Sequence, residues 1–270
     1  MAGAGLREFE PGVMHALPSR NPAIGGNMIE FCVTEWAAWA PGVETREAWQ
    51  AWALAPALPA GDGMPALPEV PAMQRRRIDR LGRMAVQVAY WCAQAEGTGV
   101  PLVFASRHGD VRRSLELLQQ QARGEPMSPT QFGLSVHNAI AALYSIVRGQ
   151  RGNYLALAAG KATAAAAMIE AAGLLADGAP EVLVVVYDAC LPEAYAAFVD
   201  EAQADHAWCW RVRADGEGQR LSLDWQMAAD DAAIRPALPA SLEVLRVVLA
   251  GDAACTQVAD GLRWHWRRHD

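Results

Sequence analysis

The strongest constraint on the fold is a run of seven residues, 181–187, that reads EVLVVVY. Its apolar side chains would point to both faces of a sheet, and such a strand needs a covering layer on each face. Two further apolar runs, at residues 100–105 and 154–159, precede it and are separated by segments of helical periodicity. Strands that alternate with helices in this way predict an α/β layered fold, with a mixed, mostly parallel sheet and helices on its faces.

The remaining pattern predicts a single domain over residues 29–270 after a loose leader at residues 1–28. A variable C-terminal extension is expected from about residue 206. In it, segments 208–213 and 220–226 flank a glycine-rich stretch and predict a β-hairpin, which short helices follow. The other expected elements are a strand at 28–33 and helices at 45–54, 73–95, 110–121, 129–147, 161–176, 241–249 and 256–264.

Composition excludes several classes of protein. Of the 270 residues, 52% are hydrophobic and 20% charged, which is typical of a globular protein and not of a disordered or collagen-like chain. The formal net charge of −7 argues against binding to nucleic acid or to an anionic membrane. Five scattered cysteines fit neither a disulfide framework nor a zinc site, so we expect a reducing compartment, no metal and no cofactor. The chain start lacks a secretory pattern and charges interrupt the longest apolar stretch, which predicts a cytoplasmic protein without a membrane span.

Residues 152–164 read GNYLALAAGKATA and predict a strand, a sharp turn and a helix of very small side chains. The turn places Lys161 at a helix N-terminus, where backbone N–H groups and the helix dipole favour a negative charge. Such a position lowers the pKa of a thiol and produces a reactive thiolate. The sequence has a lysine there and no cysteine nearby.

Several segments together resemble the N-terminal half of a β-ketoacyl synthase of the thiolase fold. They are QRRRIDRLGRM at 74–84, FASRHGD at 104–110, MSPTQFGLSVHNAIAALYSI at 127–146, the strand–turn–helix just described and the strand at 181–188. More closely, the chain is similar to the chain length factor relatives found beside aryl-polyene-type ketosynthases, from about Ile29 to Val199. The resemblance implies a half-thiolase fold that dimerises through the strand before the turn. Its interface residues would be Tyr154, Leu155, Ala156, Leu157, Ala158 and Ala159.

The departures from the family pattern indicate that the chain does not condense acyl groups. The resemblance places the acyl-accepting cysteine of active members at the turn, where this chain has Lys161. It also implies two histidines in a C-terminal half, whereas the last histidines here, His265 and His269, lie in a Trp- and Arg-rich tail. A remnant active-site region is expected at Gly160, Lys161, Ala162, Phe132, His137 and Asn138.

Three alternatives for individual residues stay open. Lys161 could fill a vestigial pocket or act as a neutral nucleophile, and Cys190 could work with a histidine such as His137. The segment SRHGD at 106–110 could hold a catalytic group, or Asp110 could simply cap a helix. A basic cluster could contact an acidic acyl carrier protein or form a solvated helix face. Its members are Arg75, Arg76, Arg77, Arg80 and Arg83.

The leading hypothesis is a non-catalytic chain length factor that forms a heterodimer with a full-length β-ketoacyl synthase. It would shape the pocket in which an aryl polyene, polyketide or fatty-acid-like chain elongates. An exposed edge strand at 154–159 would be an aggregation hazard without a partner, which supports pairing. The alternatives are an acyl-thioester transferase or hydrolase that uses Lys161 or Cys190, and a homodimeric scaffold that binds acyl carrier protein.

Overall fold

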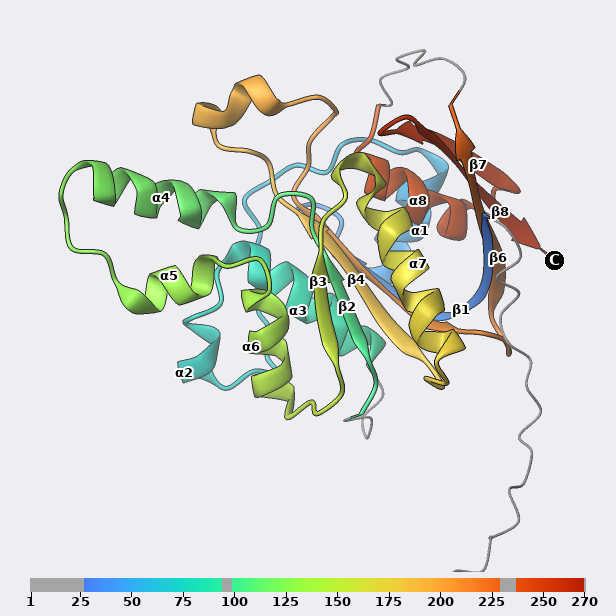
Figure 1. Ribbon diagram of the computed structural model, residues 1–270, viewed down its shortest axis with the longest axis horizontal. Coiled ribbons are helices and arrows are strands. Elements are labelled where there is room, and N and C mark those ends of the chain that lie inside the picture. The colour runs from blue at the N-terminus through green and yellow to red at the C-terminus, as the bar shows by residue number, and fades with distance from the viewer. Residues whose placement is uncertain (1–26, 94–98, 229–236, 270) are drawn as a thin grey trace, which may run out of the picture.

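The computed structural model describes residues 27–93, 99–228 and 237–269, which form one eight-stranded mixed sheet between helices (Figure 1). The predicted α/β layered fold is confirmed. Most of the leader predicted at residues 1–28 lies outside the described residues. The strand order is β3-β2-β4-β5-β1-β6-β8-β7. The strands are β1 (Met28–Trp39), β2 (Leu102–Ala105), β3 (Tyr154–Leu157), β4 (Val182–Asp188), β5 (His206–Arg213), β6 (Gln219–Met227), β7 (Ala254–Ala259) and β8 (Leu262–His269).

Helices cover both faces of the sheet, so each face has its own apolar core. On one face lie α1 (Arg46–Leu54), α7 (Thr163–Ala176) and α8 (Ala240–Ala250), and on the other α3 (Arg80–Cys92) and α6 (Ala139–Arg148). The position of β4 between the two cores explains why its sequence is apolar throughout, because successive side chains of a strand alternate between the two faces. Those in the first core are Val182, Val184 and Val186, and those in the second are Leu183, Val185 and Tyr187.

Two helices stand away from the sheet beyond β3. They are α4 (Val111–Ala122) and α5 (Pro129–Ser135), which pack on each other and form a projecting arm (Figure 1). The helix predicted at 129–147 is therefore two helices, α5 and α6, separated at residues 136–138. The helix predicted at 73–95 is likewise divided into α2 (Ala72–Arg75) and α3, because Asp79 caps a new helix by accepting a hydrogen bond from the Gly82 N–H at 2.9 Å.

Parallel pairing is confined to β3, β2 and β4. The other five neighbouring pairs are antiparallel. The expectation of a mostly parallel sheet thus applies to one end of the sheet alone. It rested on strand–helix–strand patterns, but only the connections through α4–α6 and then α7 join strands of the parallel part of the sheet.

The two strands predicted as a C-terminal hairpin exist, as β5 and β6, but they do not pair with each other. Both pair with β1, which lies between them. The linking segment 214–218 passes across β1, where the Cys32 Sγ atom lies 3.4 Å from the Gly216 carbonyl oxygen. The hairpin interpretation failed because a segment from the start of the chain occupies the position between the two strands. Residues from 206 onward therefore complete the same sheet.

The prediction of a helix at 256–264 is wrong, whereas α8 confirms the helix predicted at 241–249. The chain forms a hairpin of β7 and β8 at this point, with Asp260 and Gly261 at positive φ angles of 53° and 74° in the turn. Asp-Gly is a strong hairpin signal. The alternation of Trp264 and Trp266, both buried, also has the period of a strand.

Candidate functional site

The candidate site lies where the parallel strands β2, β3 and β4 end. Their register places Ala105, Leu157 and Val186 side by side, so the turns that follow these strands meet at one edge of the sheet. This is the edge at which open α/β sheets usually bind ligands. The turn after β2 is 106–109 and the turn after β3 is 158–161. Strand β4 ends at Asp188, and a loop follows it.

Asp188 connects the end of β4 to the turn after β2. Its Oδ1 atom accepts hydrogen bonds from the Ser106 hydroxyl at 2.9 Å and from the Arg107 N–H at 2.9 Å. The Ser106 hydroxyl oxygen in turn accepts one from the Gly109 N–H at 2.8 Å. Desolvation by the surrounding protein raises the pKa of Asp188 to about 7, against the hydrogen bonds that favour its ionised form.

Arg107 ties this turn to the loop before β5. Its guanidinium group forms ion pairs with Asp200 at 2.6 Å and with Glu201 at 3.0 Å. The second Glu201 oxygen accepts a hydrogen bond from the Ala240 N–H, at the start of α8, at 3.1 Å. Arg107 and Glu201 thus fix the positions of three separate segments of the chain.

Lys161 lies at the turn after β3, as the sequence predicts. It belongs to a short 3₁₀ helix, η1 (Gly160–Ala162), directly before α7. Its Nζ atom lies 3.5 Å from Asp200, which makes it part of the same ionic network as Arg107. The Thr163 hydroxyl accepts from the Ala159 N–H at 3.1 Å and donates to the Gly160 carbonyl at 2.7 Å, so side chain and backbone together fix this turn.

Three remnant-site residues lie outside η1. His137 contacts the turns that follow β2 and β3, whereas Asn138 and Phe132 do not. The His137 Nε2 atom hydrogen-bonds the Leu157 carbonyl at 3.0 Å, and its ring packs against Gly109, where an added Cβ would lie 2.7 Å from Nδ1. Asn138 is exposed at the start of α6. Phe132 on α5 is 59% exposed, so its ring belongs to the surface of the arm.

Cys190 and the last histidines lie outside this network. Burial and the neighbouring Asp205 carboxylate raise the pKa of the Cys190 thiol, which opposes thiolate formation, and its backbone N–H donates to Asp205 at 2.8 Å. His265 and His269 are on β8, near the opposite end of the strand order, where they bond Thr256 at 2.9 Å and Ser222 at 2.8 Å.

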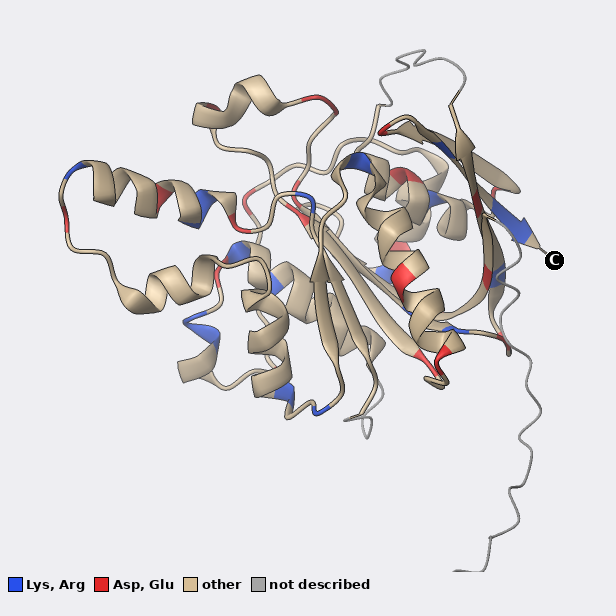
Figure 2. Ribbon diagram, viewed as in Figure 1, with Lys and Arg blue, Asp and Glu red and all other residues tan. Residues whose placement is uncertain are grey.

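The basic cluster is only partly free to meet a partner. Arg80 forms an ion pair with Asp205 at 3.1 Å, Arg75 donates to the Leu67 carbonyl at 3.1 Å and Arg83 to the Ile78 carbonyl at 3.1 Å. Arg76 and Arg77 are exposed. Figure 2 shows charges of both signs interspersed along the described chain, without a division into a basic and an acidic half.

The structure also shows an ionic cluster that sequence reasoning missed. Arg113 binds Asp79 at 2.6 Å and Asp110 at 2.7 Å, and each aspartate caps a helix, α3 or α4. Burial and then the Asp79 carboxylate raise the pKa of Asp110 to about 6. The cap at Asp110 is as predicted, so the SRHGD segment ends in a helix start. The pairing with Asp79 carries no sequence signal, because the two residues are far apart in the chain.

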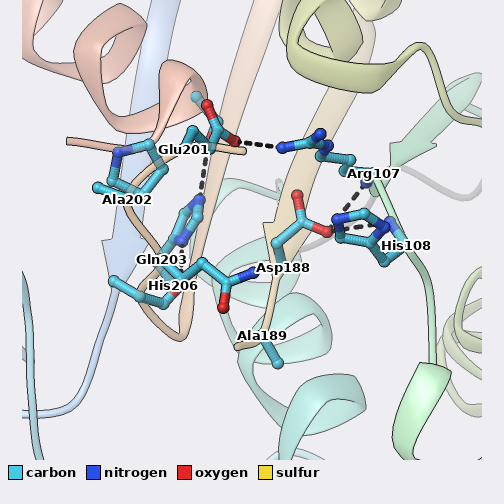
Figure 3. Close-up of a pocket in the computed structure, with 11 residues that line it drawn as sticks. Arg107, His108, Asp188, Ala189, Glu201, Ala202, Gln203 and His206 are labelled. Carbon is cyan, nitrogen blue, oxygen red and sulfur yellow. Dashed lines mark hydrogen bonds and ion pairs between the residues drawn. The ribbon is translucent and has the colours of Figure 1, made fainter. Parts of the chain in front are cut away.

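A small cavity opens among these groups (Figure 3). Its lining includes Arg107, His108, Asp188, Glu201, His206 and Ser241. Its volume of about 20 Å³ suits a group the size of a water molecule and excludes a long acyl chain. His206 was not singled out by sequence reasoning, because it lies just before the strand predicted at 208–213 and carries no local signal.

The protonation of Asp188 predicts a specific pH dependence of stability. An unfolded aspartate has a pKa of about 3.9. As the pH rises from 4 to 7, the unfolded chain releases this proton while the folded chain retains it, so the contribution of Asp188 to stability decreases and then levels off above pH 7. Asp188→Asn removes this decrease. We expect the stability of the variant, relative to the unmodified chain, to rise with pH by up to about 1.36 kcal/mol per unit.

Urea unfolding between pH 4.5 and 8 measures this difference. The exposed Asp62→Asn is the matched control for removing a carboxylate. A difference between Asp188→Asn and the unmodified chain that stays constant over this range contradicts the assignment.

A mixed sheet covered on both faces, with a strand–turn–helix of tiny side chains at its edge, agrees with the thiolase-like fold that the sequence resemblance implies. Residues 49–267 match the family described as the β-ketoacyl synthase N-terminal domain. The chain belongs to this family. No curated protein matches it.

Solved structures agree with the family. A ketosynthase (ApeO) in complex with its chain length factor (ApeC) from Xenorhabdus doucetiae is similar, with a TM-score of 0.74 and 28% identity over 89% of this chain and 100% of the matched chain. The ishigamide ketosynthase/chain length factor matches with a TM-score of 0.66 and 16% identity, over 90% of this chain and 99% of that one. The AntDE:AntF complex of a type II polyketide ketosynthase with its acyl-carrier protein has a TM-score of 0.66 and 9% identity, over 88% of this chain and 99% of the matched chain. The last two show the fold alone.

No helix among the described residues is long and apolar enough to cross a membrane.

Proposed function

We propose that this chain is a chain length factor, a ketosynthase-like subunit that does not condense acyl groups and pairs with an active β-ketoacyl synthase. The observation that carries the proposal is the turn after β3, where Lys161 binds Asp200 and no thiol is present. A lysine that pairs with a carboxylate does not replace the cysteine thiol that the resemblance places at this turn in condensing enzymes. The similarity to a structure of a ketosynthase with its chain length factor supports this role. We also propose a product of the aryl-polyene or polyketide type, which rests on the sequence resemblance.

The pairing surface that we propose is the free edge of β3. This strand is the last in the sheet order, and Leu155 in its centre is 37% exposed. Exposed apolar side chains continue from it onto the neighbouring α6 and α5, at Ile146, Val136 and Phe132. An edge strand beside an apolar surface is a common site of association between chains. A partner there would also cover the turn of Lys161, which follows β3 directly.

In this arrangement the partner supplies the nucleophile and this subunit supplies one wall of the elongation pocket. The cavity beside Asp188 is too small for a growing chain, so the pocket would form between the subunits, against α5 and α6. The exposed Arg76 and Arg77 are the members of the basic cluster available to an acyl carrier protein.

Co-purification tests the pairing. The tagged chain is recovered from its native lysate, and we expect a β-ketoacyl synthase in near-equal amount by mass spectrometry. Leu155→Lys places a charge on the free edge and should weaken the purified complex about tenfold or more, or ~1.4 kcal/mol. Leu118→Lys, at a 54% exposed position on α4, is the matched control and should leave binding unchanged. A stable monomer that binds no ketosynthase contradicts the proposal.

A further inference from the structure

A serine and a histidine meet in the small cavity, and neither takes part in the ion pairs of Lys161. The His206 Nε2 atom lies 2.7 Å from the Ser241 hydroxyl oxygen. The His206 Nδ1 atom lies 2.8 Å from the Ala204 carbonyl oxygen. A carbonyl oxygen only accepts hydrogen bonds, so Nδ1 carries the proton and the unprotonated Nε2 accepts the proton of the serine hydroxyl. This is the arrangement of nucleophile, general base and orienting acceptor that activates a serine.

The surroundings hold both residues in place. His206, at the start of β5, is buried, and Ser241 in the first turn of α8 is partly exposed and lines the cavity. The Trp208 indole N–H donates to the Ser241 carbonyl at 3.1 Å, which fixes the serine backbone. Burial lowers the pKa of His206 to about 4, so its ring is neutral at physiological pH.

Arg107, which also lines this cavity, has a hydrogen-bond donor without a partner among the described residues. The Nε–H group of Arg107 is buried and has no partner among the described residues. Its other guanidinium nitrogens are held by Asp200 and Glu201. A buried donor without a partner is unfavourable unless a ligand atom meets it. A carbonyl oxygen that becomes negatively charged during acyl transfer is a suitable ligand for such a cationic donor.

We propose that Ser241 and His206 form a hydrolytic site for acyl thioesters, with Arg107 as the group that stabilises the oxyanion. This activity is independent of pairing with a ketosynthase. The cavity volume of about 20 Å³ leaves room for one group the size of a water molecule, such as the carbonyl oxygen, so the acyl chain and the thiol part of the substrate stay outside. Glu201 is a positioning residue, because it binds both Arg107 and the Ala240 N–H that precedes Ser241.

The reaction proceeds in two balanced steps. The Ser241 oxygen attacks the thioester carbonyl carbon, its proton passes to His206 Nε2, and the carbon–sulfur bond breaks as that proton reaches the leaving sulfur. A water molecule then attacks the acyl-serine, His206 takes a proton from the water, and the serine oxygen recovers that proton when the carboxylic acid leaves. The net change is thioester plus water to carboxylic acid plus thiol.

The experiment uses the full chain and two probes, a fluorophosphonate that labels activated serines and a pair of thioesters with acetyl and octanoyl groups. We expect labelling of Ser241 by peptide mass spectrometry and hydrolysis of both thioesters above the rate in buffer, because the acyl chain lies outside the cavity. Ser241→Ala should abolish labelling and reduce acetyl hydrolysis about a hundredfold or more. Ser135→Ala, on the arm, is the matched control.

Three results overturn the proposal: no hydrolysis above buffer, labelling at another serine, or an unchanged rate in Ser241→Ala. Circular dichroism verifies that Ser241→Ala is folded, and Ser241→Cys provides a second variant. Its thiol should react with iodoacetamide faster than Cys190, and equal or slower reaction also contradicts the activation. Hydrolysis should persist down to about pH 5, because His206 becomes protonated only near pH 4. Ketosynthase binding should be the same in both variants, which separates this test from that of the proposed function.

Discussion

Trp210→Ala is expected to destabilise the protein by about 3–5 kcal/mol, the range for removing a fully buried tryptophan. Trp210 lies in β5, the strand between β4 and β1, and is completely buried. Its ring centre is 4.6 Å from that of Trp208 and 6.4 Å from that of Trp266, so three indoles pack together in one core. Such a loss is a large share of the roughly 5–15 kcal/mol that stabilises a typical domain.

Urea unfolding followed by tryptophan fluorescence and circular dichroism measures this loss. Trp91→Ala is the matched control, because Trp91 is 45% exposed at the end of α3 and its removal should cost about 1 kcal/mol or less. Equal losses in the two variants contradict the central position that the structure gives to Trp210.

Gly218→Ala is expected to be almost as damaging, although it adds only one methyl group. Gly218 has a φ of +146°, and an added Cβ would lie 2.4 Å from the Val33 carbonyl oxygen where the linking segment crosses β1. Backbone strain of about 1–3 kcal/mol and a similar cost of overpacking give a total loss of about 4 kcal/mol.

Gly216→Ala separates the two causes. Gly216 has a φ of +120°, and nothing lies within 4 Å of an added Cβ. It should therefore show the backbone strain without the clash, and lose about 1–3 kcal/mol. The difference in unfolding free energy between the two variants measures the close approach to β1, and an equal loss in both contradicts it.

The sequence predicted the elements better than their pairing. The uninterrupted run of apolar residues in β4 requires a layer on each face whatever the topology, so the layered fold followed from local pattern. The neighbours of β5 and β6 depended on β1, more than 160 residues earlier in the chain, and no local signal contains that information. The Asp-Gly turn of β7 and β8 did carry a local signal, which a helical interpretation of the surrounding residues overlooked.

The candidate site shows the same division. The position of Lys161 at a turn followed from its own segment, and so did the cap at Asp110. The partners Asp200 and Asp79 come from distant loops and helices, so the ionic networks appear only in three dimensions. The Ser241–His206 pair likewise joins two residues, each unremarkable in its own segment, 35 positions apart.

The placement of β1 between β5 and β6 has a consequence for synthesis on the ribosome. Its apolar residues leave the ribosome early, but their neighbours in the sheet follow only after residues 206–224 are made. At ~5–20 residues per second, β1 waits for roughly 10–40 s without its final neighbours. This part of the sheet must therefore assemble after most of the chain exists. During that interval the nascent chain exposes an apolar strand that chaperones or a partner subunit would protect.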